Sequence, residues 1–479
     1  MNGSPESQLD SERDSEGDSS FDLSAGGAAL VLEESGFRRR GRFLRRGSRA
    51  IDYREITHLG LSSRGLWLGT RKSVLFLRRH RFRLSDGPER LSRALVKRIS
   101  RRPGGLRQLE RIAEIDHLAQ NPSRRIATGS VALVCLAVFV LQMRDPFVQE
   151  VGAFVPFLVG RGELWRVATG NFLHAPGFFS LHLILNVLAL MAIAFLVERP
   201  MGALRALVVM GASAVGAMGG SALAGYPEVV GASGIVAGLA GAALCLELHC
   251  AKRLPAWWRL PRRMFVLALV AEGFLGFLVP AIAGAAHLGG FLAGYGITLA
   301  LADSALSSRP AARWIAVAAA GVVLTTILSF AAVSPLLLRD AQAFARYGQD
   351  LLAAPELGPG RYNELAWRMA TETDASREQL GVALELAELA VDGTDRLNPD
   401  LLDTLAEVLF QRGERDLAVA VIDEAIALAP IDDYFQEQRR RFTGERAPDD
   451  RPDPPSLPWP YRRLPEWHTP GDPADGITI

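Results

Sequence analysis

The sequence predicts an α-helical polytopic membrane protein with soluble regions at both ends. Seven mostly apolar stretches lie between residues 126 and 338, and each approaches the ~20 residues that a helix needs to span a bilayer. Charged residues make up 22% of the 479-residue chain, but they crowd into residues 1–125 and 339–479. A chain of this length also suggests about three domains.

The seven apolar stretches define the membrane region and its expected orientation. They are Ile126–Met143, Leu181–Val197, Ala206–Pro227, Val229–Leu246, Met264–Ala286, Ala286–Leu301 and Trp314–Leu338. The loop between the fourth and fifth stretches holds five cations, namely Lys252, Arg253, Arg259, Arg262 and Arg263. Cationic loops tend to stay in the cytoplasm. We therefore expect a cytoplasmic N-terminus, an extracytoplasmic C-terminus and a location in a bacterial cytoplasmic membrane.

The region before the membrane divides into three parts. Residues 1–25 are acidic and rich in Ser and Gly, so they are predicted to be disordered. Residues 26–85 alternate apolar and polar side chains between turn residues, which predicts a small basic β-rich cytoplasmic module. Residues 86–125 are predicted to be a helical linker. Residues 38–83 carry 15 Lys and Arg against two acids. The alternatives for this surface are simple solvation, contact with anionic lipid and local nucleic-acid binding.

The C-terminal region is predicted to be helical, because Ala and Leu recur at helical spacing from Tyr362 to Pro430. The pattern between Asn398 and Pro430 resembles a tetratricopeptide (TPR) repeat, a helix–turn–helix unit of about 34 residues. We therefore predict a TPR-like domain at residues 339–440, which would bind a protein or peptide partner. The alternative is a small helical cap. Residues 441–479 are rich in Pro and Asp and are predicted to be an extended tail.

Composition excludes several classes of function and gives no sign of a metal or cofactor. The net charge of +1 argues against nucleic-acid binding by the whole chain. The three cysteines, Cys135, Cys245 and Cys250, lie in or beside apolar stretches. An odd set of cysteines in membrane segments is not a disulfide framework, so their expected role is packing.

Four polar residues in the membrane region are candidates for chemistry, because polar groups are costly in a bilayer. Ser233 lies in a Gly-Ala-Ser-Gly sequence at the start of the fourth span, and His287 lies at the start of the sixth. His182 and Asn186 are four residues apart on the second span, so they share a helical face. All three spans start on the non-cytoplasmic side in the expected orientation. The four side chains should therefore lie at one depth.

Glycine pairs predict that the fourth and sixth spans touch. Each span carries two glycines four residues apart, Gly234 with Gly238 and Gly290 with Gly294. Small residues at this spacing allow helices to approach closely in lipid. Contact between these faces would bring Ser233 within hydrogen-bonding reach of His287. A serine beside a neutral histidine is the minimal nucleophile–base pair for acyl transfer.

Several motifs occur in order along residues 126–303. They are Trp165-Arg166, Phe172-Leu173-His174, His182 with Asn186, Glu198 with Gly202, Gly231 to Gly234, and His287 with Gly290 and Gly294. Together they resemble the six-helix core of the rhomboid family of intramembrane serine proteases. Residues 312–338 would then be the seventh helix of a 6+1 arrangement.

The resemblance implies roles for individual residues. Ser233 would be the nucleophile and His287 the general base, with no Asp partner. His182, Asn186 and Gly231 are assigned to the oxyanion hole or to substrate binding, together with the backbone N–H of Ser233. No metal or cofactor is implied. The implied function is cleavage of transmembrane segments of membrane proteins by this dyad within the lipid bilayer.

Two alternative functions, one departure from the family pattern and one unassigned acid stay open. A catalytically idle rhomboid-like protein that binds membrane clients is the main alternative, although intact Ser233 and His287 argue against it. A transporter would be expected to show inverted repeats, which are absent from the sequence. Ala237 stands where many family members carry a Tyr that packs on the catalytic His. Glu272 is an acid in the middle of the fifth span and either pairs with a basic neighbour or faces the cavity.

Overall fold

The structure is a computed structural model of the chain, and it forms two compact units. It describes residues 20–453 apart from 24–27, 41–49, 63–64, 71–78, 83–87, 121–125, 176–179, 252–253, 255–257, 279–281, 303–310 and 354–356. One unit comprises residues 1–156 and 166–328, and the other comprises residues 157–165 and 329–479. The predicted disorder of residues 1–19, the loop cations Lys252 and Arg253, and the tail from residue 454 onward lie outside the described residues.

The N-terminal module contains two antiparallel sheets. The first has the order β1 (Ser20–Leu23), β2 (Ala28–Leu32), β3 (Gly36–Arg40) and β4 (Ile51–Asp52), and the second has the order β5 (Ile56–Ser62), β6 (Gly65–Thr70) and β7 (Arg79–Phe82). The register pairs Leu30 with Arg39 in the first sheet and Leu59 with Leu68 in the second. Alternate strand residues such as Leu30 and Leu32 are buried, as the period of two requires.

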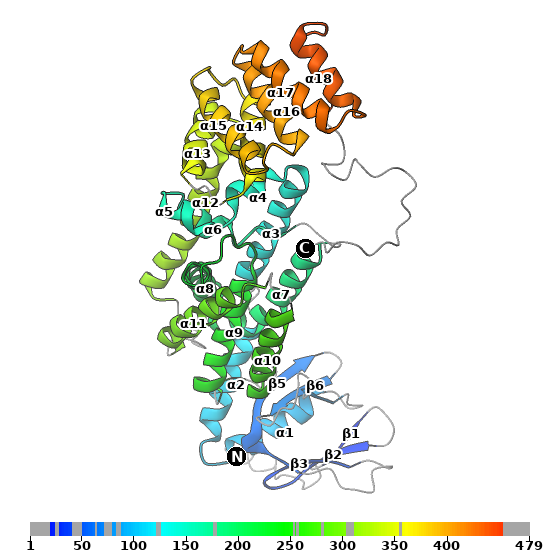
Figure 1. Ribbon diagram of the computed structural model, residues 1–479. Helices are drawn as coiled ribbons and strands as arrows, with labels where there is room; N and C mark the ends of the chain where they lie inside the picture. Colours follow the sequence, from blue (N-terminus) through cyan, green and yellow to red (C-terminus); the bar gives the residue numbers. More distant parts are fainter. Residues whose placement is uncertain are drawn as a thin grey trace, which may run out of the picture. The chain divides into compact units, whose positions relative to one another are not determined.

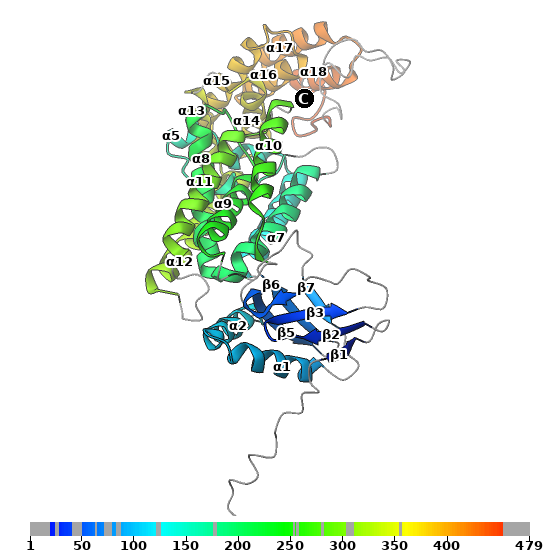
Figure 2. The same cartoon turned by 90° about the horizontal axis from the view of Figure 1, so that it is seen from below.

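Two helices complete this module, α1 (Pro88–Ser100) and α2 (Gly105–Gln120), and Figure 2 shows them beside its strands. Leu91, Leu95 and Ile99 recur every fourth residue along α1 and are buried in one core with strand residues. The predicted helical linker at residues 86–125 is therefore part of the module. Residues 20–23 correct the prediction that disorder extends to residue 25. They form β1, because Phe21 is buried in the same core.

Seven apolar helices of the described chain lie in the predicted spans. They are α3 (Ile126–Arg144), α7 (Leu181–Met201), α8 (Ala203–Leu223), α9 (Ser233–His249), α10 (Arg262–Leu278), α11 (Gly284–Leu301) and α12 (Arg313–Leu337). Five of them, all except α9 and α10, are long and apolar enough to cross a membrane. The chain is therefore a multi-pass membrane protein. Helices α9 and α10 have 17 residues each, somewhat fewer than the ~20 that span a bilayer.

Glycines bring α8, α9 and α11 into direct backbone contact (Figure 1). A Cβ added at Gly290 would overlap the carbonyl oxygen of Gly234, and one at Gly294 would overlap that of Gly238. The contact that the glycine spacing predicts between these two helices is therefore present. On the other side of α11, Gly289 lies equally close to the backbone of α8. Close packing of this kind positions the first turns of α9 and α11 side by side.

Glu198 joins the end of α7 to the start of α3. Its carboxylate is buried and accepts hydrogen bonds from the backbone N–H groups of Ala127 and Thr128, both at 2.9 Å, and from the Thr128 hydroxyl. The first N–H groups of a helix have no partner within the helix, and a negative charge is favourable beside them. Glu198 therefore satisfies the N-terminus of α3.

The second unit contains an array of short helices (Figure 1). These are α13 (Ala341–Leu352), α14 (Pro359–Thr371), α15 (Gln379–Asp392), α16 (Pro399–Gln411), α17 (Arg415–Leu428) and α18 (Asp433–Thr443). Asp340, Asn398 and Asp432 cap three of them by accepting a backbone N–H of the first turn. Helix formation in this region is confirmed, while the likeness to a TPR domain stays a prediction.

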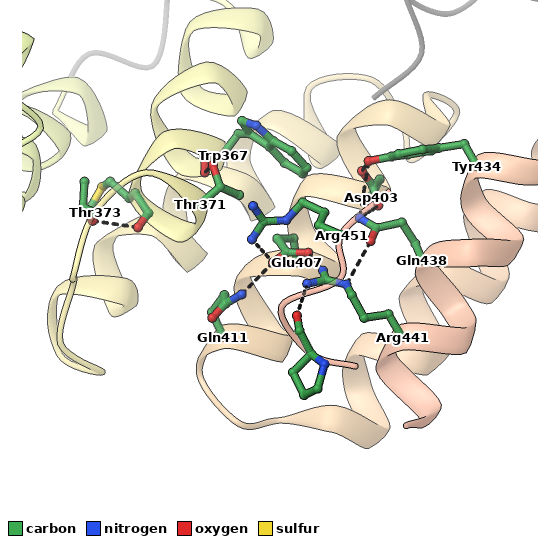
Figure 3. A network of polar contacts seen from close by, with 12 residues as sticks. Trp367, Thr371, Thr373, Asp403, Glu407, Gln411, Tyr434, Gln438, Arg441 and Arg451 are labelled. Atoms are coloured by element: carbon green, nitrogen blue, oxygen red, sulfur yellow. Dashed lines mark hydrogen bonds and ion pairs between the residues drawn. The ribbon is translucent and has the colours of Figure 1, made fainter. Parts of the chain in front are cut away.

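The predicted boundary between this domain and the tail is wrong by several residues, because α18 continues to Thr443. Arg441, in the last turn of α18, belongs to a polar network around Glu407 (Figure 3). Glu407 lies on α16 and is fully buried. Arg441 forms an ion pair with Glu407, and Arg451 donates to the same carboxylate at 2.9 Å. A charge pair buried this deeply has to remain paired. It holds α18 and the following segment against α16.

Candidate active site

Ser233 is the first residue of α9, and the loop before it is held by backbone hydrogen bonds. Val229 and Phe154 form an antiparallel bridge, and the N–H of Gly231 donates to the carbonyl of Gly170 at 2.9 Å. Gly231 has a φ of +122°, a conformation that favours glycine over other residues. The local sequence therefore fixes the point at which the helix begins, and with it the position of the serine.

His287 lies directly opposite Ser233. Its backbone N–H donates to the carbonyl of Ala283 at the start of α11, so the imidazole extends from the first turn of this helix. The Nε2 atom of His287 lies 2.7 Å from the Oγ atom of Ser233, which is hydrogen-bonding distance for a nucleophile and its base. The His287 side chain is 18% exposed. The serine and the histidine that the sequence singled out on these two helices are therefore adjacent.

His182, on the first turn of α7, borders the same space. The position of a Cβ on Gly231 would be 2.9 Å from Cε1 and 3.0 Å from Nε2 of His182, and 3.8 Å from the Ser233 hydroxyl. The His182 ring and the Ser233 hydroxyl therefore both lie within 4 Å of the same point beside Gly231. A hydrogen-bond donor at this position could stabilise negative charge on an atom bound to Ser233.

Asn186 lies one turn farther along α7 and is almost fully buried. Its side-chain amide donates to the carbonyl of His182 at 2.9 Å. An amide carries two N–H donors, so one of them is engaged within the helix. The structure thus places Asn186 on the face of α7 that carries His182, but its described hydrogen bond does not reach Ser233 or His287.

Glu272 is a member of this cluster that the sequence left unassigned. It lies on α10, and its Oε1 atom contacts Nδ1 of His287, the ring nitrogen that does not face Ser233. Of the two alternatives that the sequence left open for Glu272, pairing with a basic neighbour is the one that this contact represents. The available signal was an acid in the middle of an apolar span, because such a group is rarely placed there without a partner.

His174, in the loop before α7, is a second buried histidine near the site. Its Nδ1–H donates to the carbonyl of Phe172 at 3.2 Å, and its ring centroid lies 5.2 Å from that of His182. Burial, with a smaller contribution from His182, lowers the pKa of His174 to about 4. The side chain is therefore neutral at physiological pH. Two hydrogen bonds with the amide of Gln142 also hold the His174 backbone to α3.

Arg166 organises the loop between α3 and α7. Its side chain is fully buried, and its Nη1 donates to the carbonyls of Glu150 and Ala153 at 2.9 and 2.8 Å. Thr169 makes a similar contact with the carbonyl of Gly152 at 2.6 Å. These bonds satisfy backbone groups that would otherwise be buried without partners. They shape the loop that bridges to Val229 beside the serine.

The potential metal-binding side chains in the part of the chain that the structure describes do not form a metal site. No group of three or more His, Cys, Asp or Glu residues there could hold an ion. Cys135, Cys245 and Cys250 are buried and unbonded to one another. Burial of this kind is in keeping with the packing role that the sequence suggested.

Comparison with known proteins identifies the domain in which these residues lie. A family model described as the rhomboid domain matches residues 161–304, which include every residue of the cluster. The chain is 28% identical over 310 residues to the protein named Rhomboid protease GluP of Bacillus subtilis (strain 168), covering 63% of this chain and 54% of that protein. It is 34% identical over 163 residues to RHOMBOID-like protein 5 of Arabidopsis thaliana, covering 31% of this chain and 48% of that protein. The chain thus spans about half the length of each relative. Residues 161–304 are therefore a domain of the rhomboid family.

Proposed function

We propose that the protein is an intramembrane serine protease that cleaves transmembrane segments of membrane proteins. The observation that carries the proposal is the 2.7 Å separation between Ser233 Oγ and His287 Nε2. The Bacillus relative is named a rhomboid protease, which supports the same class of reaction. Five apolar helices of bilayer length support an action within the membrane.

In the proposed mechanism, the Ser233 hydroxyl attacks the carbonyl carbon of a substrate peptide bond while Nε2 of His287 accepts its proton. Negative charge then builds on the substrate oxygen. His182, the second amide N–H of Asn186 and the backbone N–H of Ser233 are the proposed donors to that oxygen. The imidazolium gives the proton to the leaving amine, and an acyl-enzyme remains on Ser233. Water then attacks the acyl carbon while His287 accepts its proton, and His287 returns this proton to Ser233 Oγ as the acid product leaves.

The class of substrate follows from the membrane environment. A transmembrane helix keeps its carbonyl groups in internal hydrogen bonds, so the segment to be cut has to unwind before Ser233 can attack it. Segments with helix-breaking or small residues are therefore the proposed substrates. The helical array at residues 341–443 is a proposed docking region for soluble parts of a substrate or for another protein or peptide partner.

A covalent probe tests the nucleophile most directly. The purified wild-type protein should react with a fluorophosphonate probe and cleave a model transmembrane substrate, and Ser233→Ala should do neither. The substitution removes one hydroxyl and creates no cavity, so folding should be unchanged. If the wild-type protein neither reacts nor cleaves, while it still binds membrane proteins, the catalytically idle alternative would be correct.

The proposed oxyanion donors have a separate test. Asn186→Ala should reduce kcat by about tenfold or more with a smaller change in KM, because the donor acts mainly in the transition state. The amide also holds the His182 carbonyl, so thermal stability has to be measured in parallel. A change in KM alone would reassign Asn186 to substrate binding.

A further inference from the structure

We propose that Glu272 is a positioning residue for His287, so that a carboxylate on α10 orients and supports the Ser233–His287 pair. The inference rests on the proposed proteolytic function and deepens it. Three helices contribute one member each, with Ser233 from α9, His287 from α11 and Glu272 from α10.

The argument starts from the two nitrogens of the His287 ring. Nε2 faces the Ser233 hydroxyl and Nδ1 faces the carboxylate of Glu272. A general base needs an unprotonated Nε2, which requires the ring proton to sit on Nδ1. A carboxylate that accepts a hydrogen bond from Nδ1–H selects this tautomer. Glu272 therefore holds the imidazole in the form that can accept the serine proton.

The carboxylate also acts as the reaction proceeds. When the Ser233 proton moves to Nε2, the ring becomes a cation next to the Glu272 carboxylate. An opposite charge in contact with the ring stabilises that cation. The proton stays on the ring until the leaving amine takes it. Glu272 orients and stabilises the base, and it neither gains a proton nor touches the substrate.

Helix α9 carries no side chain at residue 237 that could orient the His287 ring. Ala237 lies one turn after Ser233 on α9, and its methyl group offers neither a ring to pack on the imidazole nor a hydrogen-bond partner. His182 borders the serine from α7. Of the contacts that the structure describes for the His287 side chain, the one at Nδ1 comes from Glu272.

A second role for Glu272, in admitting the substrate, has to be separated from positioning. None of the described residues of α10 is buried, and Val266, Leu269 and Phe274 are each more than 60% exposed. A helix with so little buried surface can move more easily than its neighbours. A substitution on α10 could therefore reduce cleavage simply by changing how a transmembrane segment enters.

Two substrates of different size distinguish these roles. Cleavage of a transmembrane substrate requires entry past the helices, whereas a small fluorophosphonate probe reports only how reactive Ser233 is. Glu272→Gln has the size of the natural side chain but no charge, and Glu272→Asp keeps the charge on a shorter stem. Val266→Ala is the control for a change on an exposed part of the same helix. Each variant is purified as the full chain, and its melting temperature is measured.

Glu272→Gln should slow both probe labelling and kcat by about 10- to 100-fold, with little change in KM or melting temperature, since the neutral amide no longer selects one tautomer. Glu272→Asp should restore part of both rates, and Val266→Ala should match the wild type. Labelling of Glu272→Gln at the wild-type rate would overturn the inference, whether or not cleavage falls. The proposed function would survive that result, provided that the wild-type protein is labelled and cleaves substrate while Ser233→Ala does neither. A wild-type protein that shows neither labelling nor cleavage would overturn both.

Discussion

Gly231 and His182 leave no room for a side chain between them, since a Cβ on Gly231 would lie 2.9 Å from Cε1 and 3.0 Å from Nε2 of the ring. Real Cβ atoms are rarely found so close to another atom, so a substitution would displace His182. The glycine also has a φ of +122°, which L-residues with a side chain avoid. The position of His182 beside Ser233 therefore depends on a glycine at residue 231.

The first prediction is that Gly231→Ala lowers kcat for a transmembrane substrate by about tenfold or more, through displacement of a proposed oxyanion donor. Backbone strain alone could have the same effect, so Gly225→Ala is the matched control. Gly225 also has a positive φ, +73°, but no atom lies within 4 Å of its Cβ position. Equal losses in the two variants would show that strain, and not contact with His182, is responsible.

The second prediction concerns the contact between α9 and α11. Gly294→Ala should lower the free energy of unfolding by about 1–3 kcal/mol, because its Cβ would meet the backbone of Gly238 and force the helices apart. Gly296→Ala on the same helix meets nothing within 4 Å. It should leave stability unchanged or raise it by up to about 1 kcal/mol, since alanine is the better helix former. Denaturation in detergent micelles measures both. Equal stability of the two variants would contradict the proposed role of the close approach.

These glycines also show what the sequence could predict. The apolar stretches, the glycine spacing and the polar first turns are local patterns, and they predicted the helices and the contact that brings Ser233 to His287. Glu272 could not be assigned, because its partner depends on how α10 packs against α11. The fit of Leu91 and Leu95 into the N-terminal core was missed for a related reason. A four-residue period marks a buried helical face but does not say what covers it.

The end of the C-terminal domain could not be predicted for an electrostatic reason. Arg441 lies in a charged stretch that looks solvated in the sequence, yet its side chain is fully buried against Glu407. Buried charges are rare unless they are paired, and the partner is 34 residues away in the sequence. Composition alone therefore placed the start of the tail too early.

The third prediction is that Glu198→Gln destabilises the membrane region by about 1.5–3 kcal/mol, because an amide offers one acceptor where the carboxylate offers two. The lost charge also faced the N-terminus of α3. Thr128→Val removes only the hydroxyl donor of this cluster and should cost less. Thermal unfolding of both variants is the measurement. A larger loss for Thr128→Val would locate the stabilisation in the threonine and not in the cap.

The fourth prediction is a pH dependence in the stability of α16 to α18. Burial raises the pKa of Asp403 to about 7 from an ordinary value of 3.8, against the lowering effect of the hydrogen bond from Tyr434. The folded state thus binds a proton that the unfolded state has released, so this contribution to stability falls as pH rises from about 4 to about 7. Protection of α16–α18 amides from hydrogen exchange, corrected for intrinsic rates, should be greater at pH 5.5 than at pH 8 (about one unit or more to either side of the folded pKa).

Asp403→Asn removes this titration while keeping a carbonyl acceptor for Tyr434 and Gln438, which donate to the two carboxylate oxygens at 2.8 and 2.9 Å (Figure 3). The variant should show a flatter dependence of protection on pH over the same range. An unchanged slope would assign the effect to another titratable group, and the buried Glu407 is the next to test.

The fifth prediction is the orientation of the chain. Arg161, in the loop after α3, forms an ion pair with Asp350 in α13, with 3.2 Å between Nε and Oδ1. Both segments must therefore lie on the same side of the membrane, as they do if each of the seven apolar helices crosses it. The loop between α9 and α10 is cationic, and cationic loops stay in the cytoplasm. Arg161 and Asp350 lie on the opposite side of the membrane from this loop, so we expect them outside the cytoplasm. The N-terminal module would then be cytoplasmic.

Single cysteines on opposite sides of the membrane decide the orientation. Leu106 in α2 is 65% exposed and Ile431 after α17 is 90% exposed, whereas the three natural cysteines are at most 3% exposed and should not react. In intact cells, with any outer membrane permeabilised, Ile431→Cys should react with a membrane-impermeant maleimide and Leu106→Cys should react only after lysis. The reverse pattern would invert the topology. Ser233 and His287 begin their helices on the same side as the α3–α7 loop, so an inverted topology would open the site to the cytoplasm and restrict substrates to segments that unwind at that face.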